Sequence, residues 1–419
     1  MLIRSINCQA VKLPFRFSFG HALASRNFSI NLIVSVRVVL EDGREVTGWG
    51  ESVPRDYVTG ESPQGAMAAI NYSYAPQLQG RFFANAAELL ANLSAIFEDN
   101  MLHHKAAGAS FCALELAVLD ALAKIKKLSF AQVPALIAAH LPSQFSHIAW
   151  PIIDVRNEAM RYGGVVPFGK KTVLKLLLSF YKSYGFKTVK LKVGGSLNDD
   201  LARIKLAREI MGDDAILRVD ANCAWNLDQA KWSLAALRPY NVASCEQPVP
   251  ADDIDALIEL TSSVPETIMV DESLTTLAQA QNLIERKACN AFNIRLSKVG
   301  GVASAMKMVE LARLNDIECH LGAQVGESGI LAAAQRHFAL SCGDFANVEG
   351  AMNIFLLKGD LIKESMTVPP GAVAKAPAAG AGGLGVTVVP RLVSRYADCG
   401  NEFVQGRSKQ QKSEINAVC

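Results

Sequence analysis

The chain lacks the features that mark several common classes of protein. Its formal net charge is only +2, and no basic block is interleaved with aromatic residues, so nucleic acid is not an expected partner. Its nine cysteines are odd in number and show no metal-type spacing, which argues against a zinc site and favours free thiols in a reducing cytoplasm. No glycine-rich phosphate loop follows a first strand, so an open dinucleotide-binding sheet is disfavoured.

Long hydrophobic runs are also missing. The longest apolar stretch, residues 30–40, is interrupted by Asn31 and Arg37 and is too short to cross a bilayer. The first residues, 2–6, are strand-like, and no apolar signal core with a cleavage site accompanies them. We therefore expect a cytoplasmic protein with no membrane partner.

Residues 1–145 have the pattern of an α+β domain. Residues 30–40 are rich in β-branched side chains, and the following turn at 41–44 contains the Asp-Gly pair typical of hairpins. From residue 63 to about residue 139 the pattern is helical, most clearly at 110–122, where apolar residues recur at helical spacing. Strands followed by a run of helices predict that this first domain has an α+β fold.

From about residue 146 to residue 355 the pattern changes to alternating strands and helices. Strand-like runs occur at 148–154, 187–193, 215–220, 242–246, 267–271, 291–296, 316–321 and 345–349. The charged residues near five of these strand ends, at 192, 220, 246, 271 and 295, are spaced by 28, 26, 25 and 24 residues. Each interval fits one strand–helix unit. This predicts an α/β parallel barrel, whose chemistry lies at the carboxyl ends of the strands.

The last part of the chain is irregular. Residues 369–385 are rich in Ala, Gly and Pro, as in a linker or a surface loop. We expect residues 356–404 to return to the first domain, with 386–397 packing on it. The polar residues 405–419 are expected to form a disordered tail.

Three carboxylates end consecutive predicted strands: Asp220, Glu246 and Asp271. Parallel strands bring their carboxyl ends to one rim, so the three acids are expected to meet there. An all-oxygen set without Cys or His favours Mg²⁺, or Mn²⁺, over zinc. Asn222, two residues after the first acid, is placed to touch the same region.

Two lysines precede these acids on the neighbouring strand. Lys190 and Lys192 are two residues apart, so their side chains project to the same side. Unit charges 4 Å apart interact by roughly 4 kcal/mol at an effective dielectric of 20, so a divalent cation nearby would favour the neutral amine. A neutral lysine is a general base, and the metal would stabilise the enediolate formed beside a carboxylate.

Six motifs lie at or near these strand ends: Val189-Lys-Leu-Lys-Val-Gly194, Val219-Asp-Ala-Asn222, Cys245-Glu-Gln-Pro248, Val270-Asp-Glu-Ser273, Asn293-Ile-Arg-Leu-Ser-Lys-Val-Gly-Gly301 and Gly326-Glu-Ser328. Together they resemble the enolase superfamily, in its mandelate racemase/muconate-lactonizing branch and specifically the muconate cycloisomerase subgroup. The resemblance covers nearly the whole chain. It implies a modified TIM barrel, (β/α)₇β, with an α+β cap formed by the N-terminal region and a C-terminal return. It also implies Mg²⁺, a small carboxylic-acid substrate and a homo-oligomer.

The resemblance assigns roles to individual residues. It makes Asp220, Glu246 and Asp271 the metal ligands, Lys192 the base, and Lys190 a neighbour of the substrate carboxylate. Cap loops at 17–21 and 55–61 would close over the barrel mouth. Their candidate substrate contacts are Phe19, His21, Arg55 and Tyr57, to which the barrel adds Asn222, Lys298 and Glu327.

One position departs from the family pattern. The sixth strand usually carries a lysine as the second acid/base, but the aligned residue here is Arg295. Arginine stays charged and is a poor proton shuttle, which favours one-base chemistry, as in muconate cycloisomerisation. The β-elimination of o-succinylbenzoate synthase also needs only one base. Lys298, three residues on, is expected to open the following turn.

Several alternatives stay open. The chain could resemble dipeptide epimerases or N-acylamino acid racemases in activity, or could be a non-catalytic relative that binds carboxylates. His320 could replace the missing base, although a buried, hydrogen-bonded histidine is the simpler interpretation. Glu327 could ring the site or cap the next helix.

Overall fold

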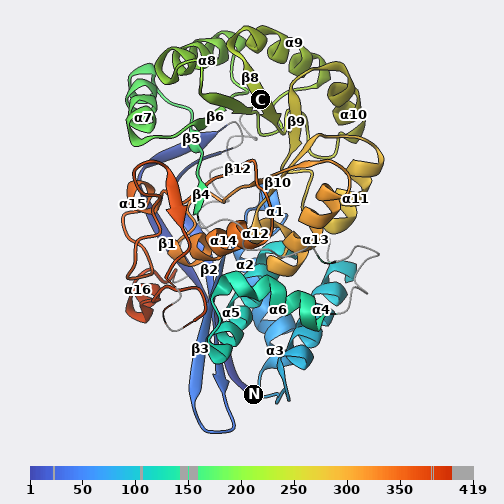
Figure 1. The fold of residues 1–419 in the computed structure, drawn as a ribbon, viewed down its shortest axis with the longest axis vertical. Coiled ribbons are helices and arrows are strands. Elements are labelled where there is room, and N and C mark those ends of the chain that lie inside the picture. The colour runs from blue at the N-terminus through green and yellow to red at the C-terminus, as the bar shows by residue number, and fades with distance from the viewer. Residues whose placement is uncertain are drawn as a thin grey trace, which may run out of the picture.

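The structure is a computed structural model that describes residues 1–21, 24–103, 107–141, 150, 159–378, 380 and 382–398. It consists of a cap containing the N-terminus and a barrel that lies above it in Figure 1. In the described parts of the chain, no helix is long and apolar enough to cross a membrane.

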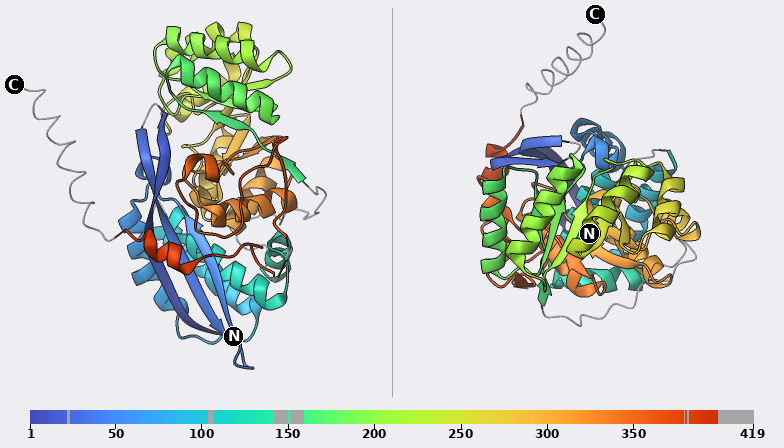
Figure 2. Two further views of the ribbon diagram at one scale, coloured as in Figure 1. Left: turned by 90° about the vertical axis from the view of Figure 1, so that its left-hand side faces the viewer. Right: turned by 90° about the horizontal axis from the view of Figure 1, so that it is seen from above.

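The cap contains a three-stranded antiparallel sheet in the order β1 (Leu2–His21), β2 (Ala24–Val39) and β3 (Glu45–Ser52). The hairpin signal at 41–44 is confirmed as the turn between β2 and β3. Residues 17–21, expected to form a loop, instead belong to β1, where Phe19 pairs with Arg26 of β2. Pairing with β2 extends this polar segment into the hairpin that reaches from the cap to the barrel in Figure 2.

Helices pack on one face of this sheet. They are α2 (Pro63–Ala68), η1 (Ala69–Tyr74), α3 (Ala75–Leu78), α4 (Ala86–His103), α5 (Gly108–Lys126), η2 (Phe130–Gln132) and α6 (Val133–His140). α5 is buried along most of its length and lies directly against β3. Gly48 permits this close approach, since a Cβ there would lie 2.0 Å from the carbonyl oxygen of Ala117. The predicted α+β cap is therefore confirmed.

The second sheet has eight strands in the order β12-β11-β10-β9-β8-β7-β6-β5. The strands are β5 (Gly164–Val166), β6 (Thr188–Lys192), β7 (Ile216–Asp220), β8 (Val242–Glu246), β9 (Thr267–Val270), β10 (Ala291–Ile294), β11 (Glu318–Leu321) and β12 (Asn347–Val348). All neighbours pair in parallel. A parallel bridge between Tyr162 and Val348 joins the two ends of the sheet. The sheet is thus the predicted barrel.

Helices connect successive barrel strands and cover the outside. They are α7 (Lys171–Tyr184), α8 (Leu197–Met211), α9 (Leu227–Leu237) with η4 (Arg238–Tyr240), α10 (Ile254–Ser263), α11 (Leu277–Glu285), α12 (Leu296–Val299) with α13 (Val302–Arg313), and α14 (Gly329–Ser341). Eight strands with seven helical connections match the (β/α)₇β pattern. The first barrel strand is β5, whereas the predicted strand at 148–154 lies outside the described residues, except for Trp150.

The C-terminal segment returns to the cap, as expected. α15 (Asn353–Leu356) is followed by a bridge between Phe15 and Leu357, and Val11 pairs with Ala397 just after α16 (Pro390–Arg395). The described part of the stretch 369–385 is not irregular throughout. It contains β13 (Val373–Lys375), which pairs with β4 (Ala159–Arg161). The tail at 405–419 lies outside the described residues.

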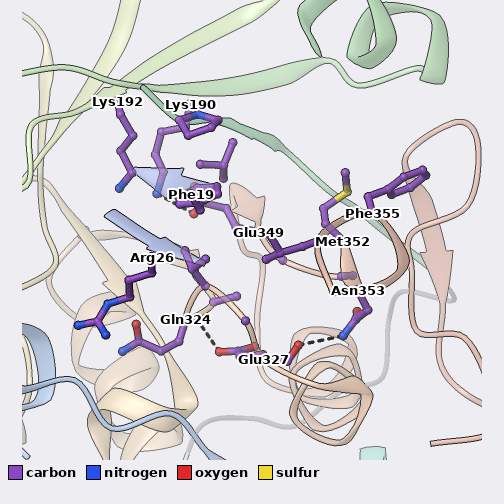
Figure 3. A pocket seen from close by; sticks show the side chains of 18 of the residues that line it. Phe19, Arg26, Lys190, Lys192, Gln324, Glu327, Glu349, Met352, Asn353 and Phe355 are labelled. Atoms are coloured by element: carbon purple, nitrogen blue, oxygen red, sulfur yellow. Dashed lines mark hydrogen bonds and ion pairs between the residues drawn. The ribbon is translucent and has the colours of Figure 1, made fainter. Parts of the chain in front are cut away.

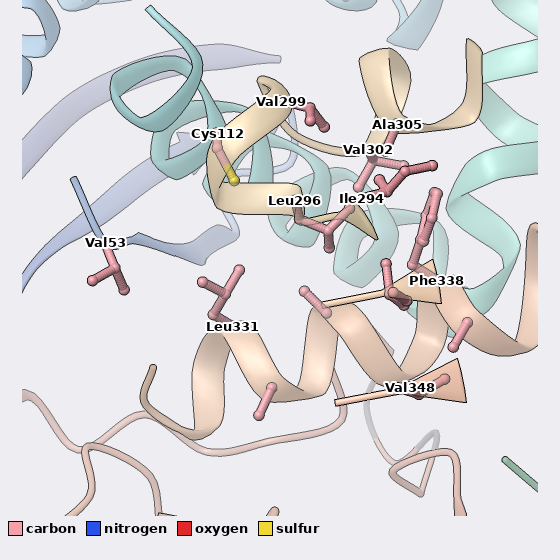
Figure 4. Packing of buried hydrophobic residues seen from close by; sticks show 14 of the residues in the cluster. Val53, Cys112, Ile294, Leu296, Val299, Val302, Ala305, Leu331, Phe338 and Val348 are labelled. Carbon is pink, nitrogen blue, oxygen red and sulfur yellow. The ribbon is translucent and has the colours of Figure 1, made fainter. Parts of the chain in front are cut away.

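Cap and barrel share one hydrophobic core, shown in part in Figure 4. Val53 and Cys112 of the cap belong to the same buried cluster as Leu296 and Leu331 of the barrel. Because this interface is apolar and continuous, the body of the cap is fixed against the barrel.

Candidate active site at the barrel mouth

A cavity of about 470 Å³ lies between the cap and the carboxyl ends of the barrel strands. The barrel contributes Lys190, Lys192, Asn222, Arg295 and Glu327 to its wall, and the cap contributes Phe19, Arg55 and Tyr57. The structure therefore brings most of the sequence-predicted site residues together around one space, part of which is seen in Figure 3. The side chain of His21 lies outside the described residues.

Strand register explains why the charged residues meet. Lys192 of β6 is level with Asp220 of β7, which is level with Glu246 of β8. Glu246 is level with Met269 of β9, so Asp271, two residues further, has its side chain on the same side and one step nearer the mouth. The regular spacing of charged strand ends in the sequence corresponds to this register.

The two lysines of β6 lie on one wall and bind different acids. The Lys190 Nζ donates to Glu246 Oε2 at 2.8 Å and to Glu349 Oε2 at 2.6 Å. Burial alone would lower the pKa of Lys190, but Glu246 and Glu349 raise it above its usual value, so this lysine stays charged. The Lys192 Nζ donates to Asp220 Oδ2 at 2.5 Å and to Asn222 Oδ1 at 2.8 Å.

Arg295 also lines the cavity and extends from the end of β10. One terminal nitrogen binds Asp271 Oδ2 and lies 3.3 Å from Glu246 Oε1, and the other donates to Gln324 Oε1 at 3.2 Å. Burial would lower the pKa of Arg295, but Asp271 and Glu246 together raise it. Arg295 is therefore a fixed cation and a poor proton donor or acceptor.

The three predicted metal ligands are fully buried, and in this structure their oxygens are bound by Lys and Arg side chains. Within the described ranges, no three His, Cys, Asp or Glu side chains are grouped tightly enough to hold a metal ion as they stand. The donor chemistry nevertheless suits Mg²⁺, because Asp220, Glu246 and Asp271 offer only oxygen. Two further buried oxygens beside them, Glu272 Oε2 and Asn293 Oδ1, have no hydrogen-bond partner.

A buried arginine balances the acids beneath the site. Arg218 is 2% exposed, and its terminal nitrogens lie 2.9 Å from Glu349 Oε1 and 3.4 Å from Glu246 Oε2. Burial would raise the pKa of Glu246, but Lys190, Arg295 and Arg218 hold it well below its usual range. Burial and the neighbouring Glu246 raise the pKa of Asp220.

Two predicted site residues have mainly structural contacts. Lys298 is 1% exposed and is not among the residues that line the cavity. Its Nζ donates to Asp271 Oδ1 at 2.7 Å and to the Asn293 carbonyl at 2.9 Å, so it holds Asp271 in place without lining the cavity. Arg55 lines the cavity but is 4% exposed and donates to Ser29 Oγ and the Val325 carbonyl, both at 3.0 Å.

The contacts of the next residue, Ser328, decide between the two alternatives for Glu327. Ser328 is the N-cap of α14, since its hydroxyl accepts from the Ile330 N–H. Glu327 instead lines the cavity, and its Oε1 accepts from the Gln324 N–H at 2.6 Å. Burial raises the pKa of Glu327 to about 8.

His320 has the surroundings of a structural histidine. It is 4% exposed, its ring pairs with Glu318 at the start of β11, and it is not among the cavity-lining residues. Burial, with the nearby Arg218, lowers the pKa of His320, so the ring is held neutral. This geometry does not place it as a second base.

The cavity residues that the sequence reasoning missed include Arg26, Glu272, Gln324 and Glu349. Two had a usable signal, because Glu349 ends the weak eighth strand run and Glu272 follows Asp271 directly. Arg26 and Gln324 had none, since each is a single polar residue whose partners are decided by tertiary packing.

Comparison with known proteins shows the family to which this fold belongs. Residues 173–392, more than half of the chain, match the family model described as enolase C-terminal domain-like. The chain belongs to the enolase superfamily.

Its enolase-superfamily relatives include enzymes of several activities. The chain is 29% identical to an N-succinyl-L-Arg/Lys racemase of Bacillus cereus, over 83% of this chain and 87% of the relative. It is 30% identical to a hydrophobic dipeptide epimerase of Enterococcus faecalis, over 81% of this chain and 87% of the relative. A chloromuconate cycloisomerase of Cupriavidus pinatubonensis is 27% identical over 89% of this chain and 94% of the relative.

Solved structures agree on the fold. The Bacillus cereus N-succinyl Arg/Lys racemase aligns with a TM-score of 0.80 and 25% identity, covering 95% of this chain and 98% of the other. The Enterococcus faecalis dipeptide epimerase, solved with Mg and the dipeptide L-Leu-L-Tyr, aligns with a TM-score of 0.76 and 26% identity, covering 92% and 100%. The enolase-type barrel and cap are thus shared along nearly the whole chain.

Proposed function

We propose that this protein is a Mg²⁺-dependent isomerase that moves a proton at the carbon next to the carboxylate of a dipeptide or an N-acylamino acid. The observation that carries this proposal is the pairing of Lys192 with Asp220 on one wall of a cavity that Arg295 also lines. A base, an acid cluster and a fixed cation then surround one substrate.

Each group has a distinct task in this proposal. Asp220, Glu246 and Asp271 would hold Mg²⁺, which when bound supplies positive charge to the oxygens of the enolate. Lys192, as the neutral amine, removes the α-proton, and the electron pair moves onto the carboxylate. Lys190 keeps its charge and lies beside that carboxylate, while Arg295 adds a second permanent charge. Isomerisation is complete when a proton is added to the opposite face of the α-carbon.

The relatives support the racemase and epimerase form of this reaction. An N-succinylamino acid racemase and a dipeptide epimerase match at 29% and 30% identity, above the chloromuconate cycloisomerase at 27%. The sequence alone favoured a muconate cycloisomerase-like reaction, so the comparisons support its alternative better.

Arg295 favours a second candidate. Racemisation normally needs a proton donor on the face opposite the base, and a guanidinium held by Asp271 and Glu246 is poorly suited to that task. Chemistry on one face, as in cycloisomerisation or elimination, needs only Lys192.

Deuterium exchange tests the proposal. Dipeptides and N-acylamino acids incubated with Mg²⁺ in D₂O should lose their α-proton signal in NMR spectra, and the Lys192→Ala variant should abolish this loss. Exchange with inversion would support racemisation, whereas exchange with retention would support one-base chemistry. Exchange by Lys192→Ala at the wild-type rate would show that another residue is the base.

Metal removal supplies a second test. EDTA should stop exchange in the wild-type protein, and added Mg²⁺ should restore it. Tight Mg²⁺-dependent binding of acids without exchange, across a broad panel, would instead indicate a non-catalytic carboxylate-binding protein.

A further inference from the structure

Arg26 of β2 is a cavity-lining cation without an acidic partner. Among the described residues its guanidinium forms no salt bridge or hydrogen bond, and its Nε is a buried donor with no acceptor. Its Cζ lies over the Tyr57 ring, 5.4 Å from the ring centroid. A guanidinium at a cavity wall with free donors is a binding group for an anion.

The groups around Arg26 also favour the binding of an anion. Burial and the charge of Arg26 lower the pKa of Arg55 to about 10, so the two guanidiniums repel each other. Neither forms a salt bridge with a carboxylate in the part of the chain that the structure describes, and Asp56 beside Arg55 is exposed. The Nε2 of Gln324, on the same cavity wall, is a second buried donor with no acceptor.

The cations at the strand ends differ from Arg26 in this respect. Lys190 lies 2.6 Å from Glu349, Lys192 lies 2.5 Å from Asp220, and Arg295 binds Asp271. Their charges are compensated within the protein, whereas the charge of Arg26 is not. In Figure 3, Arg26 and Gln324 occupy one side of the view, and Met352 and Phe355 occupy the other.

We propose that Arg26, assisted by Gln324, binds a second carboxylate of the substrate, so that the preferred substrates carry two carboxylates. One carboxylate would lie beside Lys190, as the proposed function requires, and the other beside Arg26. The second carboxylate could belong to the N-acyl group or to the amino-acid side chain. Arg26 is then the specificity-determining residue of the cap.

Calorimetry with matched ligands tests this inference. The protein with Mg²⁺ would be titrated with N-succinyl- and N-pentanoyl-L-norleucine, which differ by one terminal carboxylate on the acyl group. A second pair, L-alanyl-L-glutamate and L-alanyl-L-glutamine, places the difference on the side chain. In one pair the ligand with the second carboxylate should bind about tenfold more tightly than the ligand without it, as a charge-assisted pair allows. The pair that discriminates identifies the source of the anion.

Variants connect the preference to Arg26. Arg26→Gln should reduce the preference to about twofold or less, while Arg26→Lys, which keeps the charge, should retain part of it. Arg44→Gln is the matched control, because Arg44 lies in the exposed β2–β3 turn and pairs with Asp42. It should keep the full preference.

Three results would overturn the inference: equal affinities within both pairs, no binding of either dicarboxylate ligand, or a preference that survives Arg26→Gln. Exchange of the α-proton is measured separately. A preference that depends on Arg26, found without exchange of any acid, would support the subsite and contradict the proposed function.

Discussion

At the scale of single residues, Arg295 makes the reaction centre asymmetric, because Lys192 can transfer a proton and Arg295 cannot readily do so. Its guanidinium spans Asp271, Glu246 and Gln324, three partners that one ammonium group cannot reach in the same geometry. The permanent charge can stabilise an enolate, but it cannot readily deliver a proton.

This asymmetry predicts the effect of Arg295→Lys. A lysine would restore an amine that can give and accept a proton at this position, while still pairing with Asp271. We expect the ratio of inversion to exchange to rise by about tenfold, from the general contribution of a positioned acid or base. NMR exchange combined with chiral chromatography measures both rates. An unchanged ratio would show that position 295 does not determine the stereochemical outcome.

At the residue scale, sequence reasoning succeeds where periodicity determines position. Asp220 and Glu246 could be placed together because each ends a strand of a regular strand–helix repeat, and the register agrees. Arg26 and Gln324 could not be placed, because a hairpin and a loop have no period that predicts their spatial neighbours. Lys298 was predicted as a substrate contact, but it binds the buried Asp271 and does not line the cavity. Sequence alone does not show from which side a lysine approaches a buried acid.

At the scale of elements, three buried glutamates bind the N-termini of helices. Glu51 accepts from the Ser328 and Leu331 N–H groups of α14, Glu61 from those of Ala109 and Ser110 in α5, and Glu115 from those of Val302 and Ala303 in α13. A negative charge at this end of a helix is favourable, but burial raises the pKa of Glu51 and of Glu115 to about 7, so the accepted hydrogen bonds carry much of the interaction. Glu51 alone of these three borders the 324–328 segment, which carries Gln324 and Glu327 into the cavity.

This difference predicts separate effects for Glu51→Gln and Glu115→Gln. Each change replaces one accepting oxygen with an NH₂ group that faces a buried N–H donor, so each should lower the free energy of unfolding by about 2 kcal/mol. Only Glu51→Gln should also lower kcat, by about tenfold, because it loosens Gln324 beside Arg295. Urea unfolding and steady-state kinetics measure the two effects. Equal losses of kcat in both variants would contradict a positioning role specific to Glu51.

Element boundaries were predictable only where local pattern dominates. The barrel helices and most barrel strands follow their sequence periods, because each has a buried face. The outer end of β1 was mistaken for a loop because its strand conformation depends on pairing with β2. β5 is only three residues long, too short for a periodic signal.

At the scale of the whole molecule, α14 is joined to the C-terminal return by a buried histidine. The ring Nε2 of His337 lies 3.1 Å from the carbonyl oxygen of Leu384, and the ring packs near Phe130. Burial, with a smaller effect of Arg336, lowers the pKa of His337 from 6.5 to about 4. The folded protein therefore holds this ring neutral.

The lowered pKa of His337 in the folded protein determines how stability changes with pH. Above pH 6.5 His337 is neutral in both the folded and the unfolded chain. As the pH falls from 6.5 to about 4, the unfolded chain binds the proton first, so stability falls by up to about 3 kcal/mol. Urea unfolding at several pH values should show a smaller loss for His337→Gln than for the wild type. If the free energy of unfolding changes with pH in the same way in both proteins, His337 is not the responsible group. Subtracting one curve from the other cancels the contributions of the other titrating groups.

The return of the chain to β1 has a consequence during synthesis. The Lys12 N–H donates to the Tyr396 carbonyl at 2.8 Å, and Val11 pairs with Ala397, so the outer edge of β1 is covered by a segment that is synthesised much later. At about 5–20 residues per second, roughly 20–80 seconds separate the two on the ribosome. Throughout that interval the nascent chain carries an open strand edge, the kind of edge to which identical chains on a shared messenger can pair. Chaperone demand is thus expected to be greatest before the barrel is finished.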